Sequence, residues 1–389
     1  MERKIDFKAI LKNYDYTLLI AFILISLFSL VMIYSASMVN AVQINEVSSD
    51  YFYRNQLTSL IISLIALLGV SIIPYQWFKS SGLMLIVVFG IFGLLMLVKV
   101  FGDPVNNAKS WINLFGFNLQ PSEFAKLGVI MYLASVYAKK QRAIDNLNQS
   151  IFPPLIFVAI MMGFIATEPD YGAVMIIGLI TLVIILCSGM NIWKVLKAYS
   201  IIAIVGVIIL FVFKGTIFAG EKLNRFTTFL DPFGAHPDDS YQIINSFLAI
   251  AAGGLDGLGL GNSIQKLGYL PFPYTDFIIS IIAEELGILG VLFVMGILLF
   301  FVLKGLYIGI KFKDAYGSLL AIGISGMIAI QTVVNLAGAT SLLPLTGVTL
   351  PFVSYGGTSL LVLSISLGIL INISTYKKQL DRADKVKKV

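Results

Sequence analysis

Long apolar runs separated by short polar breaks dominate the chain. Read against those breaks, the runs predict ten helical segments, each close to the ~20 residues that a membrane-spanning helix needs. They are residues 17–38, 56–73, 82–101, 121–138, 152–167, 172–189, 194–213, 277–303, 317–339 and 350–374. The pattern therefore predicts an all-α polytopic membrane protein with ten transmembrane helices.

The amino-acid composition also indicates a membrane protein. Of the 389 residues, 58% are hydrophobic and only 12% are charged, whereas an ordinary soluble domain carries about 25% charged residues. A soluble globule and a disordered chain are therefore excluded. The only cysteine, Cys187, cannot form an intramolecular disulfide, and the only histidine, His236, cannot build a histidine-rich metal site.

The basic residues predict the orientation of the chain in the membrane. With the N-terminus inside the cell, 19 of the 27 Lys and Arg residues fall on the cytoplasmic connections and termini, as the positive-inside rule requires. Both termini are therefore predicted to be cytoplasmic. The net charge of +6 reflects this topology and the anionic inner leaflet, and does not indicate a nucleic-acid partner. Residues 17–38 are too long for the core of a signal peptide and predict an uncleaved first helix.

One extracellular connection, residues 214–276 between the seventh and eighth helices, is much longer than the others. Within it, residues 240–252 are apolar and compatible with a helix at the membrane interface. Residues 253–261 are glycine-rich, but no strand precedes them, so they do not indicate a nucleotide site; they predict close approach of backbone to backbone or to a ligand. We expect one membrane domain, residues 1–389, ending in a basic cytoplasmic tail, residues 376–389.

Ionisable residues gather near the predicted outer ends of the helices, where charge is costly and indicates function by default. Glu123 and Lys126 are three residues apart on one face of the fourth segment. Glu168 and Asp170 occupy the tight outer turn at residues 167–171. Because these groups cluster toward one face rather than at the midplane, and no repeat of two halves is evident, chemistry at the outer surface is favoured over transport.

The eighth segment carries three further carboxylates at or near its outer end. Asp276 precedes the segment, and Glu284 and Glu285 lie about 12 Å along it at 1.5 Å per residue. Each group also has a purely structural interpretation. Asp276 can be the N-cap of the eighth helix, Glu123 and Lys126 can simply neutralise each other, and Glu284 can bridge to Lys126.

A series of motifs occurs in order along nearly the whole chain. They are Tyr34-Ser35-Ala36-Ser37, Ser110-Trp111-Ile112-Asn113, Gln120-Pro121-Ser122-Glu123-Phe124-Ala125-Lys126, Glu168-Pro169-Asp170-Tyr171-Gly172, Arg225-Phe226 with Asp231-Pro232-Phe233, the run 257–263, Thr275-Asp276-Phe277, Glu284-Glu285-Leu286-Gly287, Pro344-Leu345-Thr346-Gly347 and the run 350–357. With these motifs the chain resembles the SEDS family (the FtsW, RodA and SpoVE proteins), the polytopic polymerases of bacterial peptidoglycan. The stretch at residues 260–285 is most similar to the division branch of Gram-positive bacteria.

The resemblance implies a glycosyltransferase that polymerises lipid II at the outer face of the plasma membrane, for septal wall synthesis. An elongation polymerase of the RodA branch is the alternative within the family. A lipid II flippase and a non-catalytic division scaffold are alternatives of other classes. The resemblance also implies a class B penicillin-binding protein as partner, beside other divisome or elongasome membrane proteins, because this chain has no soluble domain large enough for crosslinking.

The resemblance assigns the family's catalytic aspartate to Asp276 and its functional glutamate and lysine to Glu123 and Lys126. A carboxylate base is what deprotonation of an acceptor sugar hydroxyl needs, and cations are needed where charge develops on the leaving pyrophosphate. Lys126, Lys109 and Arg225 are the candidate cations, with Lys109 standing beside Ser110, where many members carry an arginine.

Glu168, Asp170 and Glu284 are predicted to support the site from the outer face. The sequence identifies no definite cofactor, and a divalent cation (Mg²⁺ or Mn²⁺) held by a carboxylate such as Glu123 stays open as an aid to the leaving group. Lys222 and Lys266 are expected to be ordinary loop charges. Residues 354–357, at the outer start of the last segment, are expected to serve close packing of helices.

Overall fold

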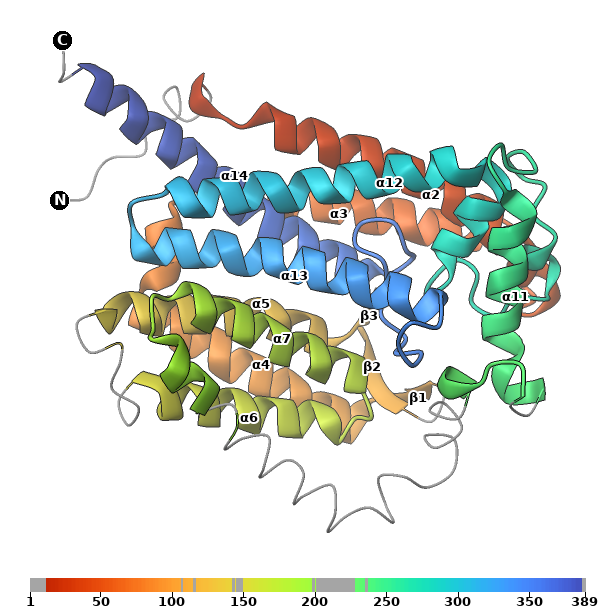
Figure 1. Ribbon diagram of the computed structural model, residues 1–389, viewed down its shortest axis with the longest axis horizontal. Coiled ribbons are helices and arrows are strands. Elements are labelled where there is room, and N and C mark those ends of the chain that lie inside the picture. The colour runs from red at the N-terminus through yellow and green to blue at the C-terminus, as the bar shows by residue number, and fades with distance from the viewer. Residues whose placement is uncertain are drawn as a thin grey trace.

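The computed structural model describes residues 12–105, 108–114, 117–141, 144, 150–197, 200, 228–234 and 237–386. Its elements form an elongated helical bundle (Figure 1). In chain order they are α2 (Tyr16–Gln43), α3 (Tyr51–Ile72), η1 (Tyr75–Lys79), α4 (Ser81–Phe101), β1 (Asp103–Val105), β2 (Ala108–Leu114), β3 (Phe117–Leu119), α5 (Pro121–Lys139), α6 (Phe152–Ala166), α7 (Tyr171–Cys187), α11 (Pro237–Gly253), η4 (Gln265–Leu267), α12 (Ile278–Lys311), α13 (Ala315–Ala339) and α14 (Gly357–Val386).

Helices occupy nine of the ten predicted segments within these described ranges, and most of the tenth, 194–213, lies outside them. Six of the helices, α2, α3, α4, α12, α13 and α14, are long and apolar enough to cross a membrane. Two more, α6 and α7, are shorter apolar helices. The helix expected at residues 240–252 is also present, as α11. A mostly helical protein with several helices of spanning length is thus confirmed.

Three short strands between α4 and α5 correct the all-α prediction. They form a small antiparallel sheet in the order β1-β2-β3, in which Asn113 pairs with Asn118 across β2 and β3. The two amides also meet, with 3.1 Å from Asn113 Nδ2 to Asn118 Oδ1. Strands of only three to seven residues give too little alternation to be recognised in a sequence.

The last helix begins at Gly357 rather than at residue 350, which is a second correction. Residues 350–356 form turns because Pro351 has no N–H to donate and Phe352 adopts a φ of 63°, a conformation outside the helix. The N–H of Leu350 donates instead to Ser354 Oγ at 2.8 Å. Residues 354–357 therefore belong partly to a loop, and their contacts, described below, are to the segment that carries Asp276.

The centre of the bundle is made by α13 and α14. In their most apolar stretches 72% and 83% of the residues are buried, against 22% in α4. Side chains of α4 such as Ile86 and Phe89 are instead about 70% exposed, as expected of a surface that faces lipid. Small residues in α13 allow this close packing: a Cβ on Gly323 would lie only 2.6 Å from Ile130 Cγ2 of α5.

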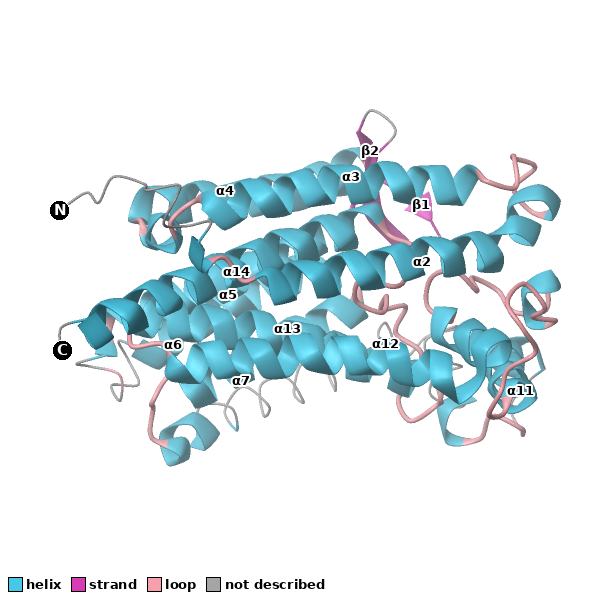
Figure 2. Cartoon of the chain, turned by 90° about the horizontal axis from the view of Figure 1, so that it is seen from above, coloured by secondary structure: helices cyan, strands magenta, loops and turns pink. Residues whose placement is uncertain are grey.

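The two ends of the bundle differ. The start of α2 and the end of α14 lie together at one end (Figures 1 and 2), where Ser374 donates to Asp15 and Lys378 Nζ lies 3.3 Å from Asp15 Oδ1. At the opposite end α11 packs against the beginning of α12 and runs across the bundle, and the three strands lie toward this end. The helix from the long connection is thus far from the termini.

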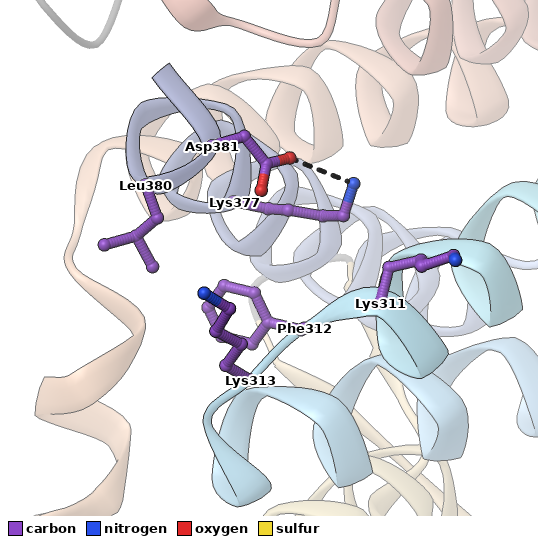
Figure 3. Close-up of a pocket in the computed structure, with 6 residues that line it drawn as sticks. All are labelled: Lys311, Phe312, Lys313, Lys377, Leu380 and Asp381. Carbon is purple, nitrogen blue, oxygen red and sulfur yellow. Dashed lines mark hydrogen bonds and ion pairs between the residues drawn. The ribbon is translucent and has the colours of Figure 1, made fainter. Parts of the chain in front are cut away.

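A small pocket lies at the end that holds the termini, between the end of α12 and the last turns of α14 (Figure 3). One of its lysines, Lys377, is 3.4 Å from Asp381 and also lies over the ring of Tyr307, 4.8 Å from its centroid. The pocket is lined by Lys311, Phe312, Lys313, Lys377, Leu380 and Asp381. Its basic lining is typical of a cytoplasmic membrane surface. Because the pocket lies at the end of the bundle that holds the termini, it is not part of the site around Asp276.

Helix α12 is broken at Gly287, where the φ and ψ angles are 62° and −159°. The glycine-rich run meets the helix at this break. The N–H groups of Leu258 and Gly259 donate to the carbonyls of Glu284 and Glu285, both at 2.9 Å. A Cβ on Gly287 would lie 2.3 Å from the carbonyl oxygen of Leu255, so only glycine fits. The prediction that these glycines let backbone approach backbone is confirmed.

Substituting Gly287 by alanine is expected to destabilise the protein strongly, because the side chain meets both a strained backbone and a carbonyl oxygen. Strain of this kind costs about 1–3 kcal/mol, to which the clash adds. Gly296→Ala in the same helix is the matched control, since nothing lies within 4 Å of its Cβ position. Thermal unfolding in detergent compares the two; equal midpoints would contradict the account of the break.

Candidate active site

The backbone on either side of Asp276 is fixed by three hydrogen bonds from other elements. Each carbonyl of residues 274–276 accepts one of them, so the short stretch before α12 is held on α13 and on the loop before α14. The donors are the N–H of Tyr355 (2.8 Å, to Tyr274), Ser354 Oγ (2.6 Å, to Thr275) and Asn335 Nδ2 (2.9 Å, to Asp276). Residues 354 and 355 thus position Asp276 rather than only packing helices together.

The carboxylate of Asp276 is half-buried beside Gly347. Its Oδ2 lies 3.8 Å from the position that a Cβ on Gly347 would take, and Gly347 has a φ of 71°. The N-cap residue of α12 is Phe277, one residue after Asp276, and the side chain of Phe277 makes no capping hydrogen bond. The structure therefore assigns the N-cap position itself to Phe277 rather than to Asp276.

The loop that contains Gly347 also contacts the acidic turn before α7. A Cβ on Gly172, the second residue of α7, would lie 2.8 Å from both the carbonyl oxygen of Thr346 and Cγ2 of Val348. The start of α7 and the Asp276 carboxylate therefore lie on either side of the same three residues, 346–348. Segments that are more than 100 residues apart in the sequence meet here.

Asp170 joins the starts of α5 and α7. Its Oδ2 accepts from Ser122 Oγ at 2.6 Å and from Gln120 Nε2 at 2.9 Å, while its Oδ1 caps α7 by accepting from the N–H of Ala173 at 3.0 Å. A side-chain oxygen that accepts from the first N–H groups of a helix caps that helix. Asp170 thus acts as a structural support of the first turns of α5.

Those first turns of α5 carry Glu123 and Lys126. Lys126 Nζ lies 2.7 Å from Glu123 Oε1, and the two side chains are 2% and 10% exposed. The predicted shared helical face is confirmed, and so is the ion pair. A buried ion pair is costly to form, so its presence is weak evidence that it stabilises the protein. The arrangement is compatible with Lys126 serving as a functional cation at this end of the bundle.

Glu168 has the most perturbed carboxyl group outside the apolar helices. It is 3% exposed, and its Oε2 makes no hydrogen bond within the described part of the chain. Burial, and then the negative charge of Asp170, raise the pKa of Glu168 to about 7. Ser110 Oγ donates to the Glu168 carbonyl at 2.7 Å, so Ser110 anchors the acidic turn on β2.

Replacing Glu168 by glutamine is expected to flatten the pH dependence of stability. Since the folded-state pKa lies above the ordinary 4.5, the contribution of the buried neutral acid is present below pH 4.5 and is lost as the pH rises through 7. At about 1.4 kcal/mol per pKa unit, the wild type should lose roughly 3 kcal/mol over this window. Unfolding midpoints at pH 5 and pH 8 measure the effect; the same fall in Glu168→Gln would contradict it.

Glu284 contacts the end of the long connection rather than Lys126. It accepts from Ser263 Oγ, from the N–H of Ile264 at 2.8 Å and from the N–H of Gln265 at 3.3 Å. Lys126 is taken by Glu123, so a bridge between Lys126 and Glu284 is wrong. A carboxylate inside an apolar helix is tolerated here because three donors satisfy it.

Lys266, expected to be an ordinary loop charge, is fully buried, which corrects that prediction. Its Nζ lies 2.7 Å from Glu285 Oε1. The signal in the sequence was the second carboxylate in the Glu284-Glu285 pair, which needed a cation that no neighbour in the chain supplies. Arg225 and Lys222 lie outside the described residues; Lys109 is part of β2, but its side chain also lies outside them.

The described residues offer no ready metal site. No three His, Cys, Asp or Glu side chains among them come together as ligands, and Glu123 is engaged by an ammonium group. A divalent cation therefore does not fit the described residues around Glu123.

Apolar helices of spanning length, packed around α13 and α14, define a multi-pass helical membrane protein. The chain belongs to the FtsW/RodA/SpoVE family of cell cycle proteins, whose model matches residues 15–379. It is 48% identical to a Bacillus subtilis protein named "Probable peptidoglycan glycosyltransferase FtsW", over 95% of this chain and 93% of that one. A protein of the same name from Trichlorobacter lovleyi is 38% identical over 95% of each chain.

The fold is also found among solved structures. A chain from a peptidoglycan synthase complex superposes with a TM-score of 0.73 at 23% identity, covering 94% of this chain and 98% of that one. At this level of identity the likeness shows the fold.

Proposed function

We propose that this protein is a peptidoglycan glycosyltransferase that polymerises lipid II into glycan strands for septal wall synthesis. The observation that carries the proposal is the full-length similarity to the B. subtilis relative. The name of that relative also favours the division branch over an elongation role of the RodA type. The geometry around Asp276 supports the proposal by offering a carboxylate whose backbone is fixed, next to a loop that also contacts the start of α7.

The proposed membrane topology has ten transmembrane helices, both termini in the cytoplasm and residues 214–276 outside. Residues 1–389 form one membrane domain, with the tail 376–389 inside. Two features support this topology. The basic pocket of Figure 3 lies at the end of the termini, and α11 and the Asp276 segment lie at the opposite end. The site then faces the outside of the plasma membrane at the septum, where the sugar portion of lipid II is exposed.

In the proposed reaction, the 4-hydroxyl of an acceptor sugar attacks the anomeric carbon of the donor. The new glycosidic bond forms as the bond to polyprenyl pyrophosphate breaks, with inversion at the anomeric carbon. Asp276 takes the hydroxyl proton as general base. Its backbone anchors matter because a general base must be held within hydrogen-bond reach of the proton it removes.

The leaving pyrophosphate gains negative charge in the transition state, and cations fixed nearby stabilise it. Lys126 is the described candidate, held in place by Glu123; Arg225 and Lys109 are the others. Glu168 and Asp170 support this cluster from the turn before α7. We propose that the lipid tails reach the site from the bilayer through a groove between helices, and that α11 forms the lid or floor of that groove.

The proposed partner is a class B penicillin-binding protein, which crosslinks the strands that this chain makes. A chain of the same fold occurs in a solved complex concerned with both polymerisation and crosslinking, which supports such an assembly. Other divisome membrane proteins are expected around the pair.

The test uses the purified chain in vesicles with its class B partner, whose crosslinking serine is disabled. Labelled lipid II is supplied, and glycan strands and movement of lipid II between leaflets are measured in the same sample. Strand formation is the expected result. Translocation without strands would overturn the proposal in favour of a flippase, and silence in both measurements in favour of a scaffold.

A further inference from the structure

Two adjacent carboxylates of α12 hold one short piece of the long connection. Glu284 accepts hydrogen bonds from Ser263, Ile264 and Gln265, and Glu285 pairs with the next residue, Lys266. Four consecutive residues are therefore bound to two consecutive side chains of α12, eight and nine residues after Asp276 in the sequence.

The second of these carboxylates belongs to a buried network that joins three elements. Lys266 Nζ lies 2.7 Å from Glu285 Oε1 and donates to Ser35 Oγ of α2 at 2.9 Å. Ser35 Oγ in turn donates to the Glu285 carboxylate at 2.7 Å. The side chains of Lys266 and Glu285 are 1% and 0% exposed. The network gives a role to the serine of the Tyr34-Ser35-Ala36-Ser37 motif, which the proposed reaction does not use.

Such a network is a poor means of stabilising a protein. Removing two charges from water costs as much as their attraction returns, and well-packed apolar replacements of similar size are often as stable or more so. Buried ion pairs do serve to select one arrangement of the chain in some systems, because an alternative arrangement would leave a charge buried without its partner. This pair is therefore expected to select one position of a segment of the chain.

The position selected is that of the outer piece of α12, residues 278–286. The break at Gly287 separates this piece from the long inner part of the helix, so the inner part does not fix its direction. Hydrogen bonds to the carbonyls of residues 274–276 hold the chain just before this piece. Its far end is held by the side chains of Glu284 and Glu285 and by their carbonyls, which accept from Leu258 and Gly259. Asp276 lies two residues before this piece, so its orientation depends on both sets of contacts.

We propose that Lys266 and Glu285 are positioning residues for the reaction: their buried ion pair, with Ser35, fixes the outer piece of α12 so that the Asp276 carboxylate faces the acceptor hydroxyl. The inference rests on the proposed function. The ion pair acts at a distance from the substrate, on the orientation of Asp276 rather than on the binding of lipid II.

The test compares the wild type with Lys266→Met/Glu285→Met in complex with the crosslinking-disabled partner. The double variant is expected to keep its unfolding midpoint and its apparent KM for lipid II, while kcat falls at least tenfold and the amides of residues 264–266 exchange hydrogen at least tenfold faster. Lys377→Met/Asp381→Leu, at the opposite end of the bundle, is the matched control and should change none of these. If the double variant does not fold, Lys266→Gln/Glu285→Gln, which removes both charges but keeps polar side chains of similar length, takes its place.

The outcomes separate the inference from the proposed function. A wild-type kcat in the double variant would overturn the inference while leaving the polymerase intact. If the amides of residues 264–266 exchange equally fast in the double variant and the wild type, the inference is overturned, whether or not the wild type makes strands. A wild type that makes no strands while the exchange rates differ would overturn the proposed function, and with it the catalytic role given to the ion pair. If the double variant has a higher apparent KM for lipid II and a lower unfolding midpoint, the pair is purely structural.

Discussion

Replacing Asp276 by asparagine is expected to lower the rate of strand formation by about 10²–10⁴-fold, the usual contribution of a positioned general base. The substitution keeps the size of the side chain and removes its ability to accept a proton. The fold should persist because the anchors around this residue use the main-chain carbonyls of residues 274–276. Gel analysis of labelled strands measures the rate.

The control for this variant is Asp256→Asn, which alters an exposed aspartate in the glycine-rich run and should leave the rate unchanged. Equal rates in Asp276→Asn and the wild type would sink the assignment of the base. Glu123 would then be the next carboxylate to test.

Replacing Lys126 by methionine is expected to cost both stability and activity. The change leaves Glu123 buried without its counterion, and breaking a buried pair in this way costs about 3–5 kcal/mol. It also removes the cation proposed to meet the leaving pyrophosphate. Unfolding midpoints and strand synthesis, measured on the same sample, should both fall.

The double variant Glu123→Gln/Lys126→Met separates these two roles. Removing both charges should restore much of the stability, since no buried charge is left unpaired, while strand synthesis stays lost. If the double variant regains activity as well, the pair is only structural, which is the alternative interpretation of these two residues.

The helices and the cluster at one end were predictable because they depend on local pattern. Apolar runs near 20 residues mark the helices directly, and the spacing of Glu123 and Lys126 places both on one helical face. The glycine-rich run was likewise informative, because glycine is required wherever two backbones approach closely. In each case the interacting residues are close in the sequence, or the residue type alone indicates that two backbones approach closely.

What could not be predicted are the contacts that join distant segments. Nothing near Lys266 in the sequence indicates that it is buried on a carboxylate 19 residues away and on a serine of α2. The same holds for Asp276, whose backbone anchors come from residues 335, 354 and 355. The start of α14 was misplaced because residues 350–356 are apolar enough for a helix but are held as a loop by Ser354.

If Asp276 acts as the general base, its loss should affect chemistry on bound lipid II and not binding. Lipid II binding and single-turnover strand formation are therefore measured on one sample of Asp276→Asn in complex with the partner. Binding is expected within about threefold of the wild type, and the turnover rate is expected to be lower by at least 10²-fold. Turnover at the wild-type rate, or a loss fully explained by weaker binding, would contradict this role of Asp276.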